Sequence, residues 1–288
     1  MKGPVTMIAV IGPVEPALLT AWCEHYRGLG ADDFAIALHA PDETSKDRRA
    51  ELVTVLREHC GKGPLVLADG PWHEQLNSDL RDRLRAHAPY GWHLLADADE
   101  FQHHPGGLSM SIATVEAGNG VLGGILLDRL AADGGFPRWS PEVGLDQTYP
   151  LGGLLTHHLL RGDPRKIVLT HPSVPVASGN HRAPGYRPPA GSTIPVHHFK
   201  WRHGVEAELR TRVRHFTTGT WRETTPAVRT EAQRLLDHLD AHLGRVDVTG
   251  DTVGFTPVTL DRLPSWWRAR VLDVVQGWSP PHSHSETG

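Results

Sequence analysis

The segment GWHLLADADEFQHHP, from Gly91 to Pro105, decides how the rest of the chain is interpreted. An apolar run, WHLLA, leads directly into three carboxylates, Asp97, Asp99 and Glu100. Carboxylates this close together repel one another, and removing them from water is costly. The sequence therefore predicts a buried strand whose end needs a compensating partner, which is water, a basic side chain or a metal ion.

Three similar strand signals precede this segment, and a helix signal separates each from the next. Strands are expected at residues 5–11, 33–39, 64–69 and 92–97, with helices at 16–30, 44–61 and 73–88. In the first helix, Leu18, Trp22, Tyr26 and Leu29 recur at helical spacing, and Gly30 is a typical stop. Strands joined by single helices pair in parallel through right-handed crossovers. This pattern predicts an α/β fold with a doubly wound, mostly parallel sheet.

The second half of the chain has weaker signals. The segment GVLGGILLDRLAADG predicts a strand that ends at Asp128 and Arg129, and further strands are expected at residues 166–170 and 194–201. Residues 134–191 are rich in proline and glycine, which is typical of loops around short strands. Helices are expected at residues 205–216, 226–243 and 263–275.

Composition narrows the class of protein. The net charge of −4 gives no basic field that would attract nucleic acid. Cys23 and Cys60 form no C-x-x-C pair, so we expect neither a disulfide framework nor a zinc ribbon, and a reduced, cytoplasmic protein is the default. No apolar run reaches the roughly 18 residues of a membrane span, and none is expected.

Polar residues cluster where the predicted strands end. In a doubly wound sheet, ligands bind at the carboxyl ends of the strands. The first three strands end at Gly12 to Glu15, at His39 and at Asp69, and the fourth ends at Asp97. We therefore expect one binding site that is built from these residues.

The acidic segment offers ligands for a divalent cation. Asp97 and Asp99 are two residues apart, so their side chains share one face of a continuing strand. Two such carboxylates at a strand end can hold Mg²⁺ or Mn²⁺, with phosphate and water completing the coordination. In VHHFKWR, His197 and His198 alternate faces, so one of them can point into the site as a neutral ligand. The alternative is a solvated acidic turn with arginine or lysine partners.

Four segments, in this order, resemble the family 2 and family 92 type glycosyltransferases of the GT-A fold. They are EPALLTAWCEHYRGLGADDFAIALHAPDET, HLLADADEF, GNHRA and HHFKWR. Those relatives share an opening of the form E-x-x-x-(L/I)-x-x-W-x-x-(H/Y)-x-x-x-G-(V/A), a hydrophobic strand that ends in D-x-D-E-F, and a late His-His/Tyr-aromatic-basic segment. The resemblance covers roughly residues 5–217 and implies a GT-A catalytic domain with additional C-terminal helices.

The resemblance also implies an activity, namely transfer of a sugar from a nucleotide-diphosphate sugar to an acceptor hydroxyl, with inversion and with Mn²⁺ or Mg²⁺. It places the metal on Asp97 and Asp99, with His198 as the late histidine. The loops from Ile11 to Glu15 and at Asp69 would hold the base and ribose, and Lys200 and Arg202 would add phosphate contacts. The predicted donor-binding residues are Ile11, Gly12, Val14, Glu15, His39, Asp69, Asp97, Lys200 and Arg202.

Sugar transfer also requires a base for the proton of the acceptor hydroxyl. The Glu-Asp pair that supplies this base in family 2 enzymes has no clear counterpart here, and the second strand ends in LHAPDET instead of the usual Asn-Gly or Asp-Ser turn. Three catalytic candidates remain. Asp128, which ends a strand beside Arg129, is preferred over His181 in SGNHRA and Asp146 in EVGLDQ. Each candidate also has a structural interpretation in place of a catalytic one. Asp128 would form an ion pair, His181 would fix a loop through a hydrogen bond, and Asp146 would be a surface acid.

The expected organisation is a catalytic domain at residues 1–217, a helical extension at 218–278 and a disordered tail at 279–288. Within the catalytic domain, residues 1–105 would form a nucleotide-binding half and residues 106–217 an acceptor half. In the last helix, Trp266 and Trp267 place a ring on each side, which would allow a homodimer contact.

Three alternatives to a metal-dependent transferase remain open. A metal-dependent phosphohydrolase or nucleotidyltransferase would use the same carboxylates but attack phosphorus. A non-catalytic protein would bind a nucleotide sugar without turnover. In a metal-independent transferase, Lys200 and Arg202 would replace the ion.

Overall fold

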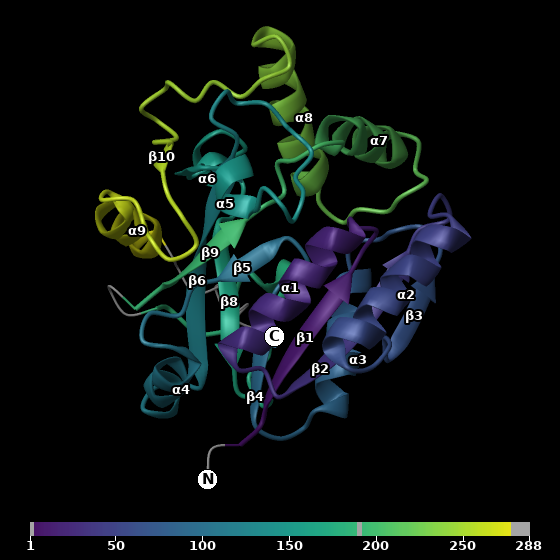
Figure 1. Ribbon diagram of the computed structural model, residues 1–288, viewed down its shortest axis with the longest axis vertical. Coiled ribbons are helices and arrows are strands. Elements are labelled where there is room, and N and C mark those ends of the chain that lie inside the picture. Colours follow the sequence, from purple (N-terminus) through teal and green to yellow (C-terminus); the bar gives the residue numbers. More distant parts are fainter. Residues whose placement is uncertain (1–2, 189–191, 278–288) are drawn as a thin grey trace, which may run out of the picture.

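The computed structural model describes residues 3–188 and 192–277, so the tail expected at 279–288 lies outside the described residues. Within them, a ten-stranded sheet has the order β10-β7-β6-β8-β4-β1-β2-β3, and β9 pairs with β6 and β5 (Figure 1). The strands are β1 (Val5–Ile11), β2 (Asp33–Ala40), β3 (Val66–Asp69), β4 (Trp92–Leu95), β5 (Glu100–Gln102), β6 (Val121–Leu130), β7 (Leu151–Gly153), β8 (Arg165–Thr170), β9 (Ile194–His198) and β10 (Thr256–Pro257).

The helices of the described part are α1 (Pro16–Leu29), α2 (Lys46–Cys60), α3 (Leu76–His87), α4 (Leu108–Glu116), α5 (Leu145–Thr148), α6 (Leu155–His158), the 3-10 turn η1 (Ser178–Asn180), α7 (Val205–Thr217), α8 (Ala227–Ala241) and α9 (Trp267–Gln276). Among these helices, none combines the length and apolar character that crossing a bilayer requires.

The direction of the strands confirms the expected fold class. β1 is parallel to β2 and β4, β2 is parallel to β3, and β6 is parallel to β9. Because β8 is antiparallel to both β4 and β6, these two strands point the same way. Thus β1, β2, β3, β4, β6, β9 and β10 run in one direction, whereas β5, β7 and β8 oppose them. The fold is α/β with a mostly parallel sheet.

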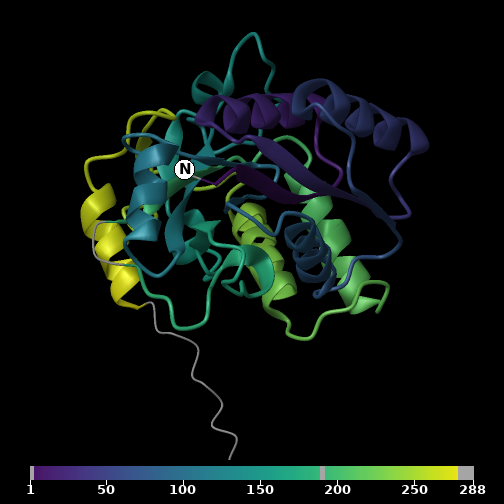
Figure 2. The same ribbon diagram turned by 90° about the horizontal axis from the view of Figure 1, so that it is seen from below.

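Helices cover both faces of this sheet, as a doubly wound fold requires. Successive strand residues point to opposite faces, so Met7 and Ala9 of β1 pack with α1 and α2, whereas Ile8 packs with α3. Figure 2 shows α1 and α2 on one side of the sheet and α3 on the other. Between α1 and α2, the free thiols of Cys23 and Cys60 are in contact.

The strands and helices expected in the first half occur in the structure and differ mainly at their ends. Local signals explain this agreement: Gly30 ends α1 in the left-handed conformation, with φ 109°, and the Ser45 side chain caps α2 by accepting a hydrogen bond from the Arg48 amide. The short strand β5 and the helix α4, which follow the acidic segment, were not predicted.

The C-terminal residues up to Gln276 pack into the same body. α8 packs against α7, β10 extends the sheet beside β7, and α9 lies in the apolar core that also contains α3. Trp267 is buried in that core, and the ring of Trp266 lies 5.3 Å from the guanidinium carbon of Arg270. A homodimer contact through this pair stays a prediction.

Helix α1 fixes the backbone of the acidic segment. The indole N–H of Trp22 donates to the carbonyl of Asp97 at 2.9 Å, and the Tyr26 hydroxyl donates to the carbonyl of Glu100 at 3.0 Å. Both aromatic side chains are fully buried. Two hydrogen bonds from side chains of α1 therefore fix the backbone of the loop that carries the carboxylates.

We expect the substitution Tyr26→Phe to lower the free energy of unfolding by about 1–3 kcal/mol, because it leaves a buried carbonyl without its donor. Urea denaturation monitored by circular dichroism measures this change. Tyr90→Phe is the matched control, since Tyr90 is 78% exposed. Equal stabilities for the two variants would contradict the anchoring role of Tyr26.

Candidate functional site

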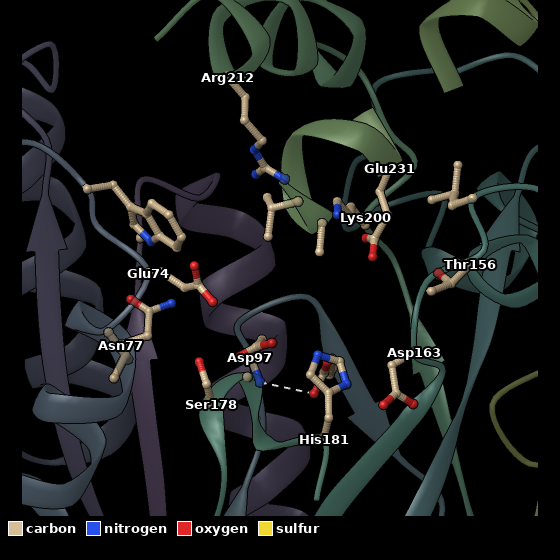
Figure 3. Close-up of a pocket in the computed structure, with 18 of the residues that line it drawn as sticks. Glu74, Asn77, Asp97, Thr156, Asp163, Ser178, His181, Lys200, Arg212 and Glu231 are labelled. Atoms are coloured by element: carbon tan, nitrogen blue, oxygen red, sulfur yellow. Dashed lines mark hydrogen bonds between the residues drawn. The ribbon is translucent and has the colours of Figure 1, made fainter. Parts of the chain in front are cut away.

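A cavity of about 580 Å³ lies at the edge of the sheet where β1, β2 and β4 end (Figure 3). Its walls also include the segment after β3, the start of β8, the residues around η1, the end of β9, and side chains of α7 and α8. Because β8 runs antiparallel to β4, its first residues lie at the same edge as the carboxyl ends of the parallel strands. The cavity is thus at the position that the strand pattern predicts for a ligand site.

The predicted site residues that line this cavity are Gly12, His39, Asp97, His181, His198 and Lys200. Others do not face it. Ile11 and Val14 are buried in the apolar core, and Asp69 pairs with Arg49 at 2.7 Å on the outer surface. These three side chains therefore do not line the cavity, and the donor-binding role of the loops that carry them stays a prediction.

Lys166 of β8 compensates the acidic segment. Its ammonium lies 2.8 Å from Asp97 Oδ2 and 2.7 Å from Glu100 Oε1, and it donates to the carbonyl of Gly179 at 3.1 Å. An ammonium has three N–H donors, and each has an acceptor here. The partner that the sequence left open is therefore a lysine.

The ionisation of this cluster follows from its contacts. Burial raises the pKa of Glu100 to about 7, although Lys166 acts in the opposite direction. At Asp97, burial alone would raise the pKa. The charge and hydrogen bond of Lys166 have the larger effect, so the pKa of Asp97 lies below its ordinary value. Burial alone would lower the pKa of Lys166, and the two carboxylates together raise it above its ordinary value. The lysine is therefore charged at neutral pH.

Arg202 neutralises the remaining acids of this region. Its Nε lies 2.9 Å from Glu15 Oε2, and its Nη1 lies 3.7 Å from Asp99 Oδ2. The guanidinium is mostly buried, and none of the three side chains lines the cavity. The predicted donor contacts of Arg202 and Glu15 are corrected accordingly, because these groups bind each other.

The predicted metal ligands Asp97, Asp99 and His198 do not fit a metal ion in this arrangement. The ammonium of Lys166 bonds Asp97, and the guanidinium of Arg202 lies beside Asp99. His198 is not occupied in this way, because its Nδ1 bonds Asp128 and leaves Nε2 available to a ligand. Within residues 3–188 and 192–277, no group of three or more His, Cys, Asp or Glu side chains is placed to hold a metal. A divalent cation bound by these residues would have to displace internal cations first.

Asp128 is a positioning residue and not a base that an acceptor can reach. It is fully buried, and its carboxylate accepts hydrogen bonds from the amide and hydroxyl of Thr156 and from the indole of Trp201, at 2.7–2.8 Å. Its fourth partner is Nδ1 of His198, also at 2.8 Å. This corrects the preferred prediction for the base: Asp128 orients the ring of His198, which lines the cavity.

The other two candidates for the catalytic base, Asp146 and His181, have different surroundings. Asp146 bonds the buried Arg129 at 2.8 Å and the amide of Leu260 at 3.1 Å, away from the cavity, so its predicted role as a base is corrected to a structural ion pair. His181 lines the cavity, and its Nδ1 bonds the carbonyl of Arg165 at 2.7 Å. Burial lowers the pKa of His181 to about 4, so the ring is neutral and Nε2 is an acceptor.

Two cations of the cavity form no direct ion pair. Lys200 and Arg212 both line it, and in the described part of the chain their cationic groups form no hydrogen bond, although Lys200 Nζ lies 5.0 Å from the ring centre of Trp201. Burial lowers the pKa of both, and the charge of Arg212 lowers the pKa of Lys200 further, whereas the charges of Asp99 and Glu231 act in the opposite direction on both. An anion between them would relieve this unfavourable arrangement.

Glu231 of α8 is a carboxylate on the same side of the cavity. Figure 3 shows it next to Lys200, across the cavity from His181. Among the described residues, its oxygens have no hydrogen-bond donor. Burial raises the pKa of Glu231, against the lowering effects of Lys200 and Arg212. A carboxylate whose pKa is raised accepts a proton more readily than an ordinary one.

Lys166, Arg212 and Glu231 are site residues that the sequence did not predict. A lysine in the apolar strand KIVLT was a usable signal, because buried lysines are nearly always paired. Arg212 and Glu231 carry no such signal, since each occupies an ordinary polar position on an amphipathic helix.

Comparison with known proteins gives only distant matches. No protein-family model matches the sequence, and no curated protein matches it. Among solved structures, TarS of S. aureus is 13% identical with a TM-score of 0.31; the match covers 87% of this chain but only 45% of TarS. Glucosyl-3-phosphoglycerate synthase from Mycobacterium tuberculosis, in complex with Mn²⁺, uridine diphosphate and phosphoglyceric acid, is 13% identical with a TM-score of 0.31, covering 91% and 89% of the two chains.

A third solved structure, UDP-glucose pyrophosphorylase complexed with UDP-glucose, is 12% identical with a TM-score of 0.28, covering 81% and 88%. Sequence identities and TM-scores this low assign no function to the chain. The function must therefore follow from the cavity and its residues.

We expect Asp128→Asn to lower the pKa of His198. In the wild type, burial acts to lower this pKa, but the hydrogen bond and charge of Asp128, together with Asp99, raise it overall. An NMR titration of the histidine ring resonances against pH measures the change in the pKa of His198. Asp146→Asn is the control, because it removes an equivalent charge from an ion pair with Arg129. An unchanged His198 titration in Asp128→Asn would contradict the coupling.

Proposed function

We propose that this protein is a glycosyltransferase that moves a sugar from a nucleotide-diphosphate sugar to an acceptor hydroxyl. The observation that carries the proposal is the pair of cations without a direct ion pair, Lys200 and Arg212, facing a cavity at the carboxyl ends of the parallel strands. A diphosphate matches them in charge, and the volume of about 580 Å³ falls in the range of small-molecule sites. The D-x-D-E-F strand end and the late His-His segment, which resemble GT-A enzymes, add support.

The cavity has two chemically different ends. Glu74 and Asn77 lie at one end (Figure 3). Trp72, two residues before Glu74, also lines the cavity, so that an aromatic ring and an amide are available to a nucleobase. Thr156, Asp163 and Glu231 lie at the other end (Figure 3). We assign the nucleotide to the first end and the acceptor to the second, with the diphosphate beside Lys200 and Arg212.

This arrangement supports direct displacement at the anomeric carbon. The acceptor oxygen forms the new bond to this carbon while the bond to the diphosphate oxygen breaks and its electron pair remains on the diphosphate. Lys200 and Arg212 stabilise the charge that develops there. Glu231 takes the proton of the acceptor hydroxyl, with His181 Nε2 as the second candidate. Attack from the side opposite the leaving group would invert the anomeric configuration.

An attack on phosphorus is the competing reaction, as in a nucleotidyltransferase or phosphohydrolase. The products distinguish the two, because sugar transfer releases a nucleoside diphosphate, whereas attack on phosphorus releases a nucleoside monophosphate or a sugar phosphate. A protein that only binds the nucleotide sugar would release neither.

We expect nucleoside diphosphates to raise the melting temperature of the protein, because a ligand of the native state stabilises it by mass action. A panel of uridine, guanosine, thymidine, cytidine and adenosine diphosphates, followed by calorimetry of the best ligand, measures this. Lys200→Ala and Arg212→Ala should each weaken binding about 10- to 100-fold, through loss of a charged hydrogen bond.

Arg214→Ala is the matched control, since Arg214 is an exposed arginine of the same helix α7. A flat thermal response to the whole panel would count against the proposal, and so would equal binding by the Arg212→Ala and Arg214→Ala variants.

We expect Glu231→Gln to lower kcat by about 10²- to 10⁴-fold with little change in donor affinity, because it removes the proton acceptor and keeps the shape. Asp237→Asn is the control, as Asp237 is exposed on the same helix α8. Full activity of Glu231→Gln would transfer the role of base to His181 and contradict this assignment.

A further inference from the structure

The D-x-D segment of this protein already contains a cation of its own. Lys166 lies between Asp97 and Glu100, at 2.8 and 2.7 Å from their carboxylate oxygens. The register of the sheet explains how it arrives there. Leu94 of β4 pairs with Leu169 of β8 in antiparallel fashion, so three further steps bring the position of Asp97 beside Lys166.

The backbone of Lys166 cannot move away easily. It lies in the middle of the sheet, because β8 pairs with β4 on one side and with β6 on the other, where Lys166 is opposite Gly124. The residue is 3% exposed. Its third donor is used by the carbonyl of Gly179, so each N–H of the ammonium has a protein acceptor, although the side chain lines the cavity.

The remaining candidate ligands also have protein partners. Asp99 lies beside Arg202, which binds Glu15 as well. His198 keeps Nε2 available, because its hydrogen bond to Asp128 uses Nδ1, so the competition with a metal concerns the two aspartates. The positive charge that a metal would bring to these acids is therefore already present in the protein.

The cavity nevertheless has positive charge available for a ligand. Lys200 and Arg212 together carry two positive charges, which equals the charge of a divalent cation, and neither forms a direct ion pair in the described part of the chain, although the charges of Glu231 and Asp99 act on both. Figure 3 shows both side chains pointing into the cavity from the side opposite Asp97.

We propose that Lys166 is a built-in counterion that closes the acidic segment to Mg²⁺ and Mn²⁺, and that Lys200 and Arg212 neutralise the donor diphosphate without a metal ion. The second half of this inference rests on the proposed function, whereas the first half does not. It replaces the expectation of a Mn²⁺ or Mg²⁺ cofactor.

Binding of Mn²⁺ alone tests the first half. Electron paramagnetic resonance of free Mn²⁺, titrated with protein, should show no specific site in the wild type at millimolar metal. Lys166→Met removes the ammonium and keeps the length of the side chain, so this variant should gain a Mn²⁺ site. Lys62→Met is the control: Lys62 also pairs with a carboxylate, Asp33, but at the surface, and its variant should resemble the wild type.

A Mn²⁺ site in the wild-type protein that disappears in Asp97→Asn would overturn the inference. So would a folded Lys166→Met variant that binds no Mn²⁺. If Lys166→Met does not fold, the wild-type titration decides the question by itself, because a wild type without a site supports the inference and a wild type with an Asp97-dependent site contradicts it.

Nucleotide binding by the wild type tests the second half. The same nucleoside diphosphate panel should raise the melting temperature equally in EDTA and in Mn²⁺. Stabilisation only in Mn²⁺ would overturn the inference but leave the proposed function intact. No stabilisation in either buffer would refute the proposed function, and the second half with it, while the Mn²⁺ titration would still decide the role of Lys166.

Discussion

The ion pairs of Lys166 with the buried Glu100 and with the half-exposed Asp97 are the interaction on which the site depends. They exist because one strand, β8, runs against its neighbours and brings the start of a strand to an edge that otherwise holds strand ends. Removing one partner of a buried pair costs about 3–5 kcal/mol, so the three groups hold one another in place. Trp22 and Tyr26 fix the backbone beneath them, and the acidic loop thereby becomes a rigid floor for the cavity.

Charge is distributed unequally over the two sides of this cavity. On the floor, each acid of the D-x-D-E segment lies beside a lysine or an arginine. On the opposite side, Lys200 and Arg212 form no direct ion pair, and burial is unfavourable for both charges, which Asp99 and Glu231 offset in part. This side of the cavity therefore suits an anionic ligand, and the proposed one is a diphosphate. Glu231, near these cations but without a hydrogen-bond donor, is placed to act on a group bound beside that anion.

The fold of the first half could be predicted because its information is local. Apolar runs, capping residues such as Ser45 and stops such as Gly30 mark each strand and helix. The same information placed Asp97 at a strand end and located His198 and Lys200 in a segment of the same strand type. It also indicated that only one of the two adjacent histidines would reach the site, and His198 lines the cavity whereas His197 is fully buried.

The remaining parts of the site depend on long-range packing. Whether Asp128 is an exposed base or a buried positioning group is decided by Thr156, Trp201 and β9, which cover the end of β6. Lys166 meets Asp97 only through the antiparallel register of β8. Arg212 and Glu231 reach the cavity because α7 and α8 pack against each other above it, and no pattern within either helix indicates this.

A crystal structure of the protein with a stabilising nucleoside diphosphate, grown in the presence of Mn²⁺, tests the central claim most directly. We expect the diphosphate oxygens to contact Lys200 and Arg212, with Lys166 still bonded to Asp97 and Glu100 and no manganese among these acids. Anomalous density for manganese between Asp97 and the diphosphate, with Lys166 displaced, would contradict it.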